Sequence, residues 1–309
     1  MPAWNELLTE TKAAGSVHDV IRRKYLKRLG QYTKRNTIIY YSAWLQKPNL
    51  LREPAVSLGI SDADKNGFMS VIHEMDRKKS LDLLLHTPGG DMAATESLIE
   101  YLRHMFGNDI RAFVPQIAMS GGTIIALACK EIVMGKESSI GPIDPQYGGV
   151  AANGLLQEFE RIRGEIKSDP TAALLWGPIL QKLQPGFITE CENAIAWSKE
   201  MALRFLITNM LTGQANNDKL AAEIVDKLTE KKNTKFHGRH IGLDEAVSII
   251  GAANIKKLED DQKLQDLVLT VHHATVITMQ ATACYKIIEN QDGRAFVQIA
   301  QMHVVPAVG

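Results

Sequence analysis

Strand-like and helix-like segments alternate along the first half of this sequence, and this alternation limits the possible folds more than any other feature. Short runs of β-branched, aromatic and aliphatic residues, which are typical of strands, occupy residues 37–41, 81–85, 110–114 and 132–134. Helix-like stretches lie between them, after Ser61, over 98–106 and over 120–130. Strands separated by helices form a parallel sheet with right-handed crossovers, so the sequence predicts an α/β fold.

The rest of the chain is predicted to be mainly helical. We expect a helical N-terminal arm at residues 1–35, a main domain at 36–255 and a helical C-terminal extension at 256–309. Apolar residues recur at three-to-four spacing from Leu264 to Ile288, which predicts one long helix. A single small domain cannot easily cover such a stripe on both sides, so we expect a homo-oligomer.

Composition argues against several classes of partner. Lys and Arg together number 35, as do Asp and Glu, so the net charge does not favour nucleic acid or an anionic membrane. Cys129, Cys191 and Cys284 have neither metal-ligand nor disulfide spacing, and no metal or other cofactor is expected. We see no signal-peptide pattern and no apolar run of transmembrane length, so we expect a cytoplasmic protein.

Two glycine-rich turns carry the candidate chemistry. The sequence TPGG at 87–90 follows a strand, and its proline and glycines leave backbone N–H groups bare at the edge of the sheet. The sequence AMSGG at 118–122 places Ser120 between the next strand and a helix.

Each turn alone has a simple structural explanation, because Ser120 could cap a helix and the glycines could form tight connections. In a parallel sheet, however, the ends of successive strands lie side by side. Ser120 Oγ and the bare N–H groups would then share one crevice, which is the minimum for acyl transfer.

A third segment, SSIGPIDPQ at 138–146, contains Asp144 between two prolines. Asp144 could belong to an ordinary Asp-Pro turn. Alternatively, it supplies a carboxylate that is held rigidly near the nucleophile.

The series TPGGD (87–91), AMSGGT (118–123) and SSIGPIDPQ (138–146) resembles the core of the Clp-type peptidases and signal peptide peptidases. More narrowly, it resembles the serine dehydrogenase proteinase (SDH) family over about residues 35–255. The resemblance implies a ClpP/crotonase fold, a spiral of ββα units with a mainly parallel sheet. It also implies a serine endopeptidase with Ser120 as nucleophile and an oxyanion hole made by backbone N–H groups. Those groups belong to Gly89 or Gly90 and to Gly121.

The general base is less clear from the sequence. Clp-type peptidases use the order Ser, His, Asp, but no histidine lies between His104 and His237. The resemblance to the SDH family implies the order Ser, Asp, His, which assigns Asp144 and His237 here. The segment KFHGRHIG at 235–242 places His237 on the family histidine, with His240 as the alternative. Chain order is free because a triad is defined by geometry.

Other functions remain open. A Ser–Lys dyad of the signal peptide peptidase type would use Lys182 or Lys167, and the apolar neighbours of Lys182 favour it, because a lysine base must be desolvated. A crotonase-type acyl-CoA site is disfavoured by the serine, and a scaffold with a degenerate site is the third possibility. The expected substrate is a peptide or protein. No P-loop motif is present, so any ATPase that delivers the substrate must be another chain.

Overall fold

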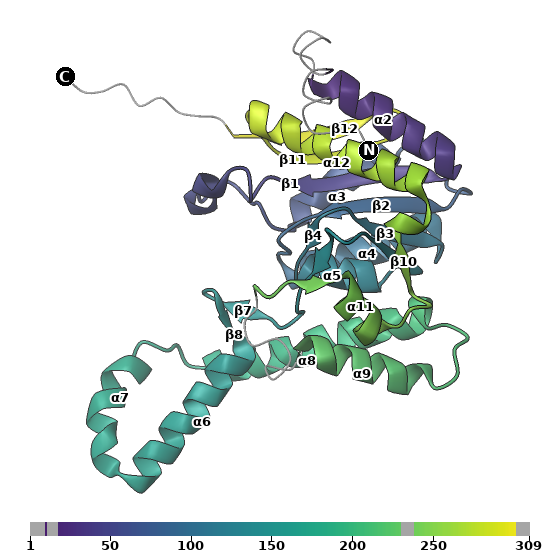
Figure 1. Cartoon of the computed structure of the whole chain (residues 1–309). Helices are drawn as coiled ribbons and strands as arrows, with labels where there is room; N and C mark the ends of the chain where they lie inside the picture. Colours follow the sequence, from purple (N-terminus) through teal and green to yellow (C-terminus); the bar gives the residue numbers. More distant parts are fainter. Residues whose placement is uncertain (1–9, 11–17, 230–237, 301–309) are drawn as a thin grey trace, which may run out of the picture. The chain divides into compact units, whose positions relative to one another are not determined.

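The structure is a computed structural model that describes residue 10, residues 18–229 and residues 238–300 (Figure 1). The chain divides into two compact units. The first comprises Met1–Ile140 and Ile241–Gly309, and the second comprises Gly141–His240. The domain boundaries predicted at residues 35 and 255 stay a prediction.

The first unit is built on a seven-stranded, mainly parallel sheet with the order β10-β5-β3-β2-β1-β11-β12. Its parallel strands are β1 (Asn36–Ser42), β2 (Leu81–His86), β3 (Ile110–Val114), β5 (Glu131–Met134) and β10 (Ile255–Lys257). The antiparallel strands are β11 (Cys284–Asn290) and β12 (Ala295–Ile299). The predicted α/β fold with a mainly parallel sheet is confirmed.

The helices between the parallel strands also agree with the sequence pattern. They are α3 (Asp62–Ile72), α4 (Met92–Phe106) and α5 (Gly121–Leu127). Ser61 and Asp64 form the capping box expected at the start of α3. Shorter elements of this unit are the 3-10 helices η1 (Pro48–Arg52) and η4 (Leu258–Asp260) and the helix α11 (Leu243–Ile250).

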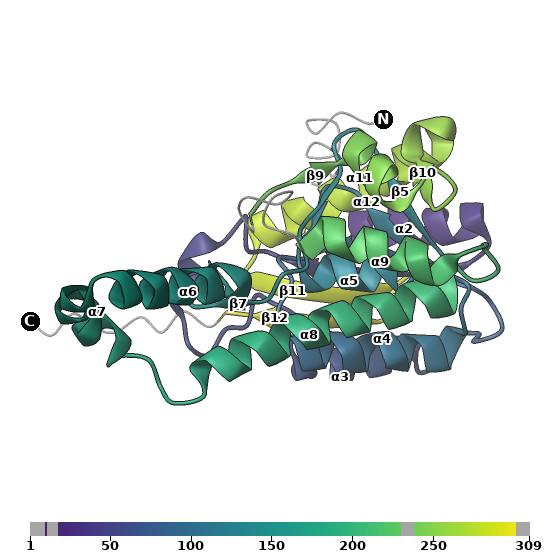
Figure 2. The ribbon, with the colours of Figure 1, turned by 90° about the horizontal axis from the view of Figure 1, so that it is seen from below.

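Helices cover both faces of the main sheet. Successive side chains of a strand point to opposite faces, so the contacts of neighbouring residues show what covers each face. The ring of Tyr41 contacts His272 of α12 (Gln262–Ala281) on one face. Tyr40 contacts Phe68 of α3 on the other. Helix α2 (His18–Thr33) packs beside α12 (Figure 1), and α3 packs beside α4 (Figure 2).

The predicted single helix from Leu264 to Ile288 is wrong. Helix α12 ends at Ala281, and the last apolar residues of the stripe belong to β11, which pairs with β1. The consecutive β-branched pair Ile287 and Ile288 suits a strand that is buried on both faces. The helical part of the stripe is buried against α2 and the sheet. It is therefore no argument for a subunit contact, and the homo-oligomer stays a prediction.

A small sheet of three strands completes the first unit, with the order β4-β6-β9. It consists of β4 (Ile117–Ala118), β6 (Ser139–Ile140) and β9 (Ile241–Gly242). Strand β4 leads directly into the turn that contains Ser120, so this sheet holds the start of that turn.

The second unit is mainly helical, as predicted. It contains the hairpin of β7 (Gln146–Tyr147) and β8 (Val150–Ala151), the 3-10 helix η2 (Pro170–Ala172) and a π-helical turn, η3 (Leu206–Met210). Its α-helices are α6 (Ala152–Ser168), α7 (Ala173–Leu180), α8 (Phe187–Phe205) and α9 (Asn217–Thr229). Helix α8 packs against both α6 and α9 (Figure 2).

Among the helices in the described ranges, none combines the length and the apolar character needed to cross a membrane. The three cysteines are all buried and free.

Candidate active site

The two glycine-rich turns lie side by side in the first unit. Thr87 and Ala118 form a parallel β-bridge. The Met119 N–H donates to Thr87 O at 3.0 Å, and the Thr87 N–H donates to Ile117 O at 3.3 Å. These backbone bonds place Gly89 and Ser120 next to each other, as the order of the parallel strands predicts.

Glycine is required at position 89 by both conformation and space. Its φ of +92° lies in the region that side chains rarely adopt. A Cβ on Gly89 would lie 2.7 Å from Ser120 Cβ and 2.9 Å from the backbone nitrogen of Gly121. The absence of a side chain at Gly89 thus leaves the space beside Ser120 open.

Ser120 has an unusual backbone, with φ +49° and ψ −113°. Within the described residues, only two other non-glycine residues, Lys34 and Asn216, have a positive φ. Such strain concentrates at functional sites when the surrounding structure enforces it. A serine on a strained strand-to-helix turn is also the feature that exposes the nucleophile in the α/β-hydrolase fold.

The Ser120 side chain is half-buried and does not cap the helix that follows it. Over residues 18–229 and 238–300, its hydroxyl has no hydrogen-bond partner. Helix capping therefore does not explain this serine, and its oxygen is free to meet a ligand.

Two backbone N–H groups beside Ser120 likewise lack a partner among the described residues. The Gly89 N–H donates to Thr87 Oγ1 at 3.2 Å, whereas those of Gly90 and Gly121 have no partner in the part of the chain that the structure describes. The nitrogen of Gly90 lies 3.5 Å from the position of a Cβ on Gly121. A free hydroxyl and two free N–H donors thus occupy one small region, an arrangement that suits attack on a carbonyl and stabilisation of the resulting oxyanion.

The expected catalytic partners of Ser120 belong to the second unit. Asp144 is buried in the second unit, with 4% of its surface exposed. The segment around it is fixed by two bonds of Ile143, whose N–H donates to Leu228 O at 3.1 Å and whose carbonyl accepts from Ser198 Oγ at 2.6 Å. Rigid support of Asp144, expected from its two prolines, therefore comes from α8 and α9 as well.

The candidate bases belong to the second unit too. His240 is exposed, and His237 lies outside the described residues. Lys167, at the end of α6, and Lys182, after α7, are both exposed. Neither lysine is desolvated by its own unit, so the apolar sequence neighbours of Lys182 do not bury it.

A buried ion pair close to the first turn was missed by the sequence analysis. Lys286 of β11 and Asp64 of α3 are completely buried. The Lys286 ammonium donates to Asp64 Oδ1 and Oδ2 at 2.8 and 3.0 Å and to Gly59 O at 2.8 Å. Tyr40 donates to Asp64 Oδ2 at 2.8 Å. Burial lowers the pKa of Lys286, and the Asp64 carboxylate partly offsets this effect.

A second missed feature is a group of buried rings behind the same turn. His86, the last residue of β2, lies between Trp44 and His272, with ring centroids 4.5 and 5.4 Å away. Tyr41 lies 5.2 Å from His86 and contacts His272 Nδ1 through its hydroxyl at 3.2 Å. Burial lowers the pKa of His86 to about 3. His86 is therefore a neutral packing residue near the site.

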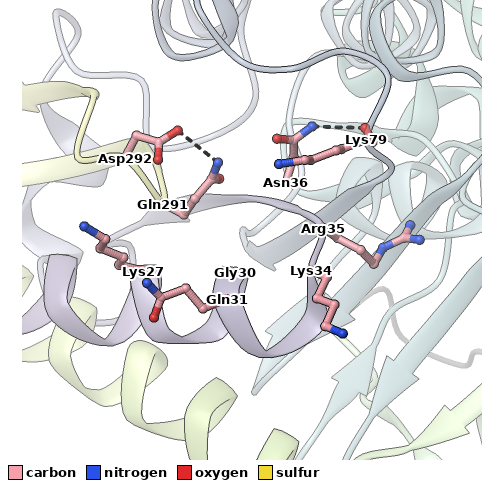
Figure 3. Close-up of a pocket in the computed structure, with 9 residues that line it drawn as sticks. All are labelled: Lys27, Gly30, Gln31, Lys34, Arg35, Asn36, Lys79, Gln291 and Asp292. Atoms are coloured by element: carbon pink, nitrogen blue, oxygen red, sulfur yellow. Dashed lines mark hydrogen bonds between the residues drawn. The ribbon is translucent and has the colours of Figure 1, made fainter.

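A surface pocket of about 380 Å³ lies at the opposite, amino-terminal edge of the parallel strands (Figure 3). Lys27, Lys34, Arg35 and Lys79 line it, together with Asp292. The carboxylates of Asp82 and Asp109 already neutralise Arg35. The pocket adjoins the last turn of α2, where the negative end of the helix dipole favours lysines and disfavours a bound anion.

The chain is similar to several known proteins. A family model described as "ClpP-like SDH-type serine proteinase" matches residues 16–238. Two curated relatives are proteins of Methanocaldococcus jannaschii. "Uncharacterized protein MJ0137" is 32% identical over 50% of this chain and 52% of its own length. "Uncharacterized protein MJ1495" is 36% identical over 38% of this chain and 39% of its own length. The matches therefore span about half of these relatives or less.

Two solved structures of a 1510-N membrane-bound stomatin-specific protease are also similar. One, an alanine mutant, is 21% identical, with a TM-score of 0.27 over 65% of this chain and 92% of that chain. The other, a mutant in complex with a substrate peptide, is 21% identical, with a TM-score of 0.26 over 68% and 93% of the two chains. The family model alone covers well over half of the sequence, and this chain belongs to the ClpP-like SDH-type serine proteinases.

Proposed function

We propose that this chain is a serine peptidase that cleaves peptide bonds through an acyl-enzyme on Ser120. The observation that carries the proposal is the strained Ser120, whose hydroxyl lies beside two backbone N–H groups; all three groups lack a partner among the described residues. Membership of a serine proteinase family supports the same reaction.

In the proposed reaction, a base removes the Ser120 proton and Oγ bonds to the scissile carbonyl carbon. The N–H groups of Gly90 and Gly121 hold the oxyanion that forms. The carbon–nitrogen bond then breaks, and the amine leaves with the proton. Water hydrolyses the ester in a second round and releases the acid. Each oxyanion donor of this type typically contributes 10²- to 10³-fold to kcat.

We infer that the base is His237, oriented by the Asp144 carboxylate. The support is the family order Ser, Asp, His together with the rigid, buried setting of Asp144. His240 is the alternative histidine. A Ser–Lys dyad with Lys182 or Lys167 is less favoured, because both lysines are exposed in their own unit.

Labelling with a fluorophosphonate tests the nucleophile. We expect the wild-type chain to be labelled at one serine, and Ser120→Ala to lose both the label and the hydrolysis of fluorescein-labelled casein. Ser70→Ala, which changes an exposed serine near the end of α3, is the control and should keep both. If the wild type is not labelled, or if Ser120→Ala keeps full activity, the peptidase proposal is wrong and the scaffold remains.

Alanine variants of the four candidate bases identify the base. His237→Ala should abolish turnover, and Asp144→Asn should lower kcat far more than it raises KM. The double variant should lose little more than the worse single one, because triad members act as a unit. His240→Ala, Lys182→Ala and Lys167→Ala should stay close to wild type. An inactive lysine variant beside an active His237→Ala would replace the triad with the dyad.

A further inference from the structure

We propose that Lys286 and Asp64 are positioning residues that fix the Gly90 N–H in the orientation needed for catalysis. They act through the backbone of residues 59–61. The inference rests on the proposed function, because the Gly90 N–H is one of the two proposed oxyanion donors of that site.

The first link joins the ion pair to residues 59–61. Lys286 donates to Gly59 O at 2.8 Å, and Asp64 Oδ2 accepts from the Ser61 N–H at 2.9 Å. The two charged side chains are bonded to each other, so they hold this short segment from both sides of Ile60.

The second link joins residues 59–61 to the first glycine-rich turn. The Ile60 N–H donates to Gly89 O at 2.7 Å, and the Asp91 N–H donates to Ile60 O at 2.9 Å. The contact is so close that a Cβ on Gly90 would lie 2.1 Å from the Ile60 nitrogen. Only glycine at position 90 therefore allows this close approach to Ile60.

The geometry of the peptide bond completes the argument. Gly89 O and the Gly90 N–H belong to the same planar trans peptide, so they point in opposite directions. When Ile60 holds Gly89 O, the Gly90 N–H must point away from Ile60. A movement of residues 59–61 that carried Gly89 O with it would also reorient the Gly90 N–H, because both groups belong to one rigid peptide plane.

Stability alone does not explain such an ion pair. Apolar side chains of similar volume often replace a buried pair with no loss of stability, because the charges lose their hydration on folding. An apolar residue at 286, however, could not bond to Gly59 O. The ammonium uses its bonds on the two oxygens of Asp64 and on this carbonyl, which fits a positioning role.

The test is the double variant Lys286→Met/Asp64→Asn. It removes both charges together, so no unpaired charge is left buried, and the asparagine oxygen still accepts from Ser61 and Tyr40. We expect kcat for p-nitrophenyl butyrate to fall about 10- to 100-fold with little change in KM, because misplacing one donor costs that much. The rate of labelling by a fluorophosphonate should fall by a similar factor.

The matched control is Arg22→Met/Glu289→Gln. Arg22 and Glu289 form a second completely buried ion pair at 2.5 Å, and Glu289 lies on the same strand as Lys286 but faces α2. This pair has no bond to residues 59–61. Thermal melting gives the folded fraction of each variant, and kcat is expressed per folded molecule. A purely structural role then predicts an equal change in kcat for the two double variants. Positioning predicts a fall in kcat for the first variant only.

Ser120→Ala, assayed in parallel, separates this inference from the proposed function. Full activity of Ser120→Ala would overturn the proposed function. An inactive Ser120→Ala, with kcat unchanged in Lys286→Met/Asp64→Asn, would overturn the positioning role alone. If the double variant does not fold, Tyr40→Phe serves instead, because it removes the hydroxyl's bonds to Asp64 and Thr87 and no charge. We then expect a smaller fall in kcat at constant KM, and an unchanged kcat overturns the inference.

Discussion

His86 gives the protein a pH-dependent stability that can be worked out from its surroundings. Its ring is fully buried and packs against Tyr41 of β1, Trp44 and His272 of α12. Within the described residues, neither ring nitrogen has a hydrogen-bond partner, and no acid is among these neighbours. A proton on His86 would place an uncompensated charge in the core.

The size of the effect follows from linkage. The pKa of His86 is lowered from 6.5 to about 3 by burial, so the unfolded chain binds the proton at a higher pH than the folded chain. The stability from His86 is present above about pH 6.5 and is lost as the pH falls towards 3. Between about pH 7.5 and about pH 5, His86 alone should remove about 2 kcal/mol of unfolding free energy. His272 adds a loss of the same sign, because its pKa is also lowered by burial.

Urea unfolding of the wild type and His86→Phe at these two pH values isolates the His86 contribution. Phenylalanine fills the same space without titrating, so its free energy of unfolding should fall by about 2 kcal/mol less than that of the wild type. Circular dichroism gives the free energies. His104→Gln, at an exposed histidine, should keep the wild-type difference. Equal losses in the wild type and His86→Phe would refute the reasoning.

Four further substitutions test the packing of the fold. Gly90→Ala should destabilise the fold by about 2 kcal/mol or more and remove activity, because the new Cβ meets the Ile60 nitrogen; a wild-type melting temperature would contradict this. Gly164→Ala, in the exposed middle of α6 where nothing lies within 4 Å of the new Cβ, should stabilise by about 0.5–1 kcal/mol in urea unfolding. Leu174→Glu and Leu175→Glu should change stability by less than about 0.5 kcal/mol, because these side chains are 80% and 77% exposed. A larger loss of melting temperature for either leucine variant would mean that another chain covers α7.

The sequence predicted the strands that are short and clearly bounded. Residues 37–41 and 81–85 are short apolar runs bounded by polar residues, and they form β1 and β2. The adjacency of Gly89 and Ser120 followed from the order of parallel strands alone. Between Leu264 and Ile288, by contrast, apolar residues on a buried strand happened to continue the helical spacing. Periodicity could not detect the break after Ala281.

The sequence could not predict the buried residues that support the site, because their partners are far away along the chain. Lys286 lies in an apolar strand, and its partner Asp64 is 222 residues away. Nothing local to either residue indicates the other, since Asp64 already had a sufficient local explanation as a capping residue. From the sequence, His86 is predicted only to end a strand. Its burial depends on packing against α12, which the sequence does not show.

The position of β11 has a consequence for the synthesis of the chain. Strand β1 pairs with β11 through Ile38 and Asn290, which are about 250 residues apart. On the ribosome, β1 is therefore complete long before its outer neighbour exists, and one edge of the growing sheet stays open until the last strands emerge. Open edges of this kind recruit strands from other molecules. A chain that is cut or stalled before residue 284 should therefore aggregate rather than accumulate as a folded fragment.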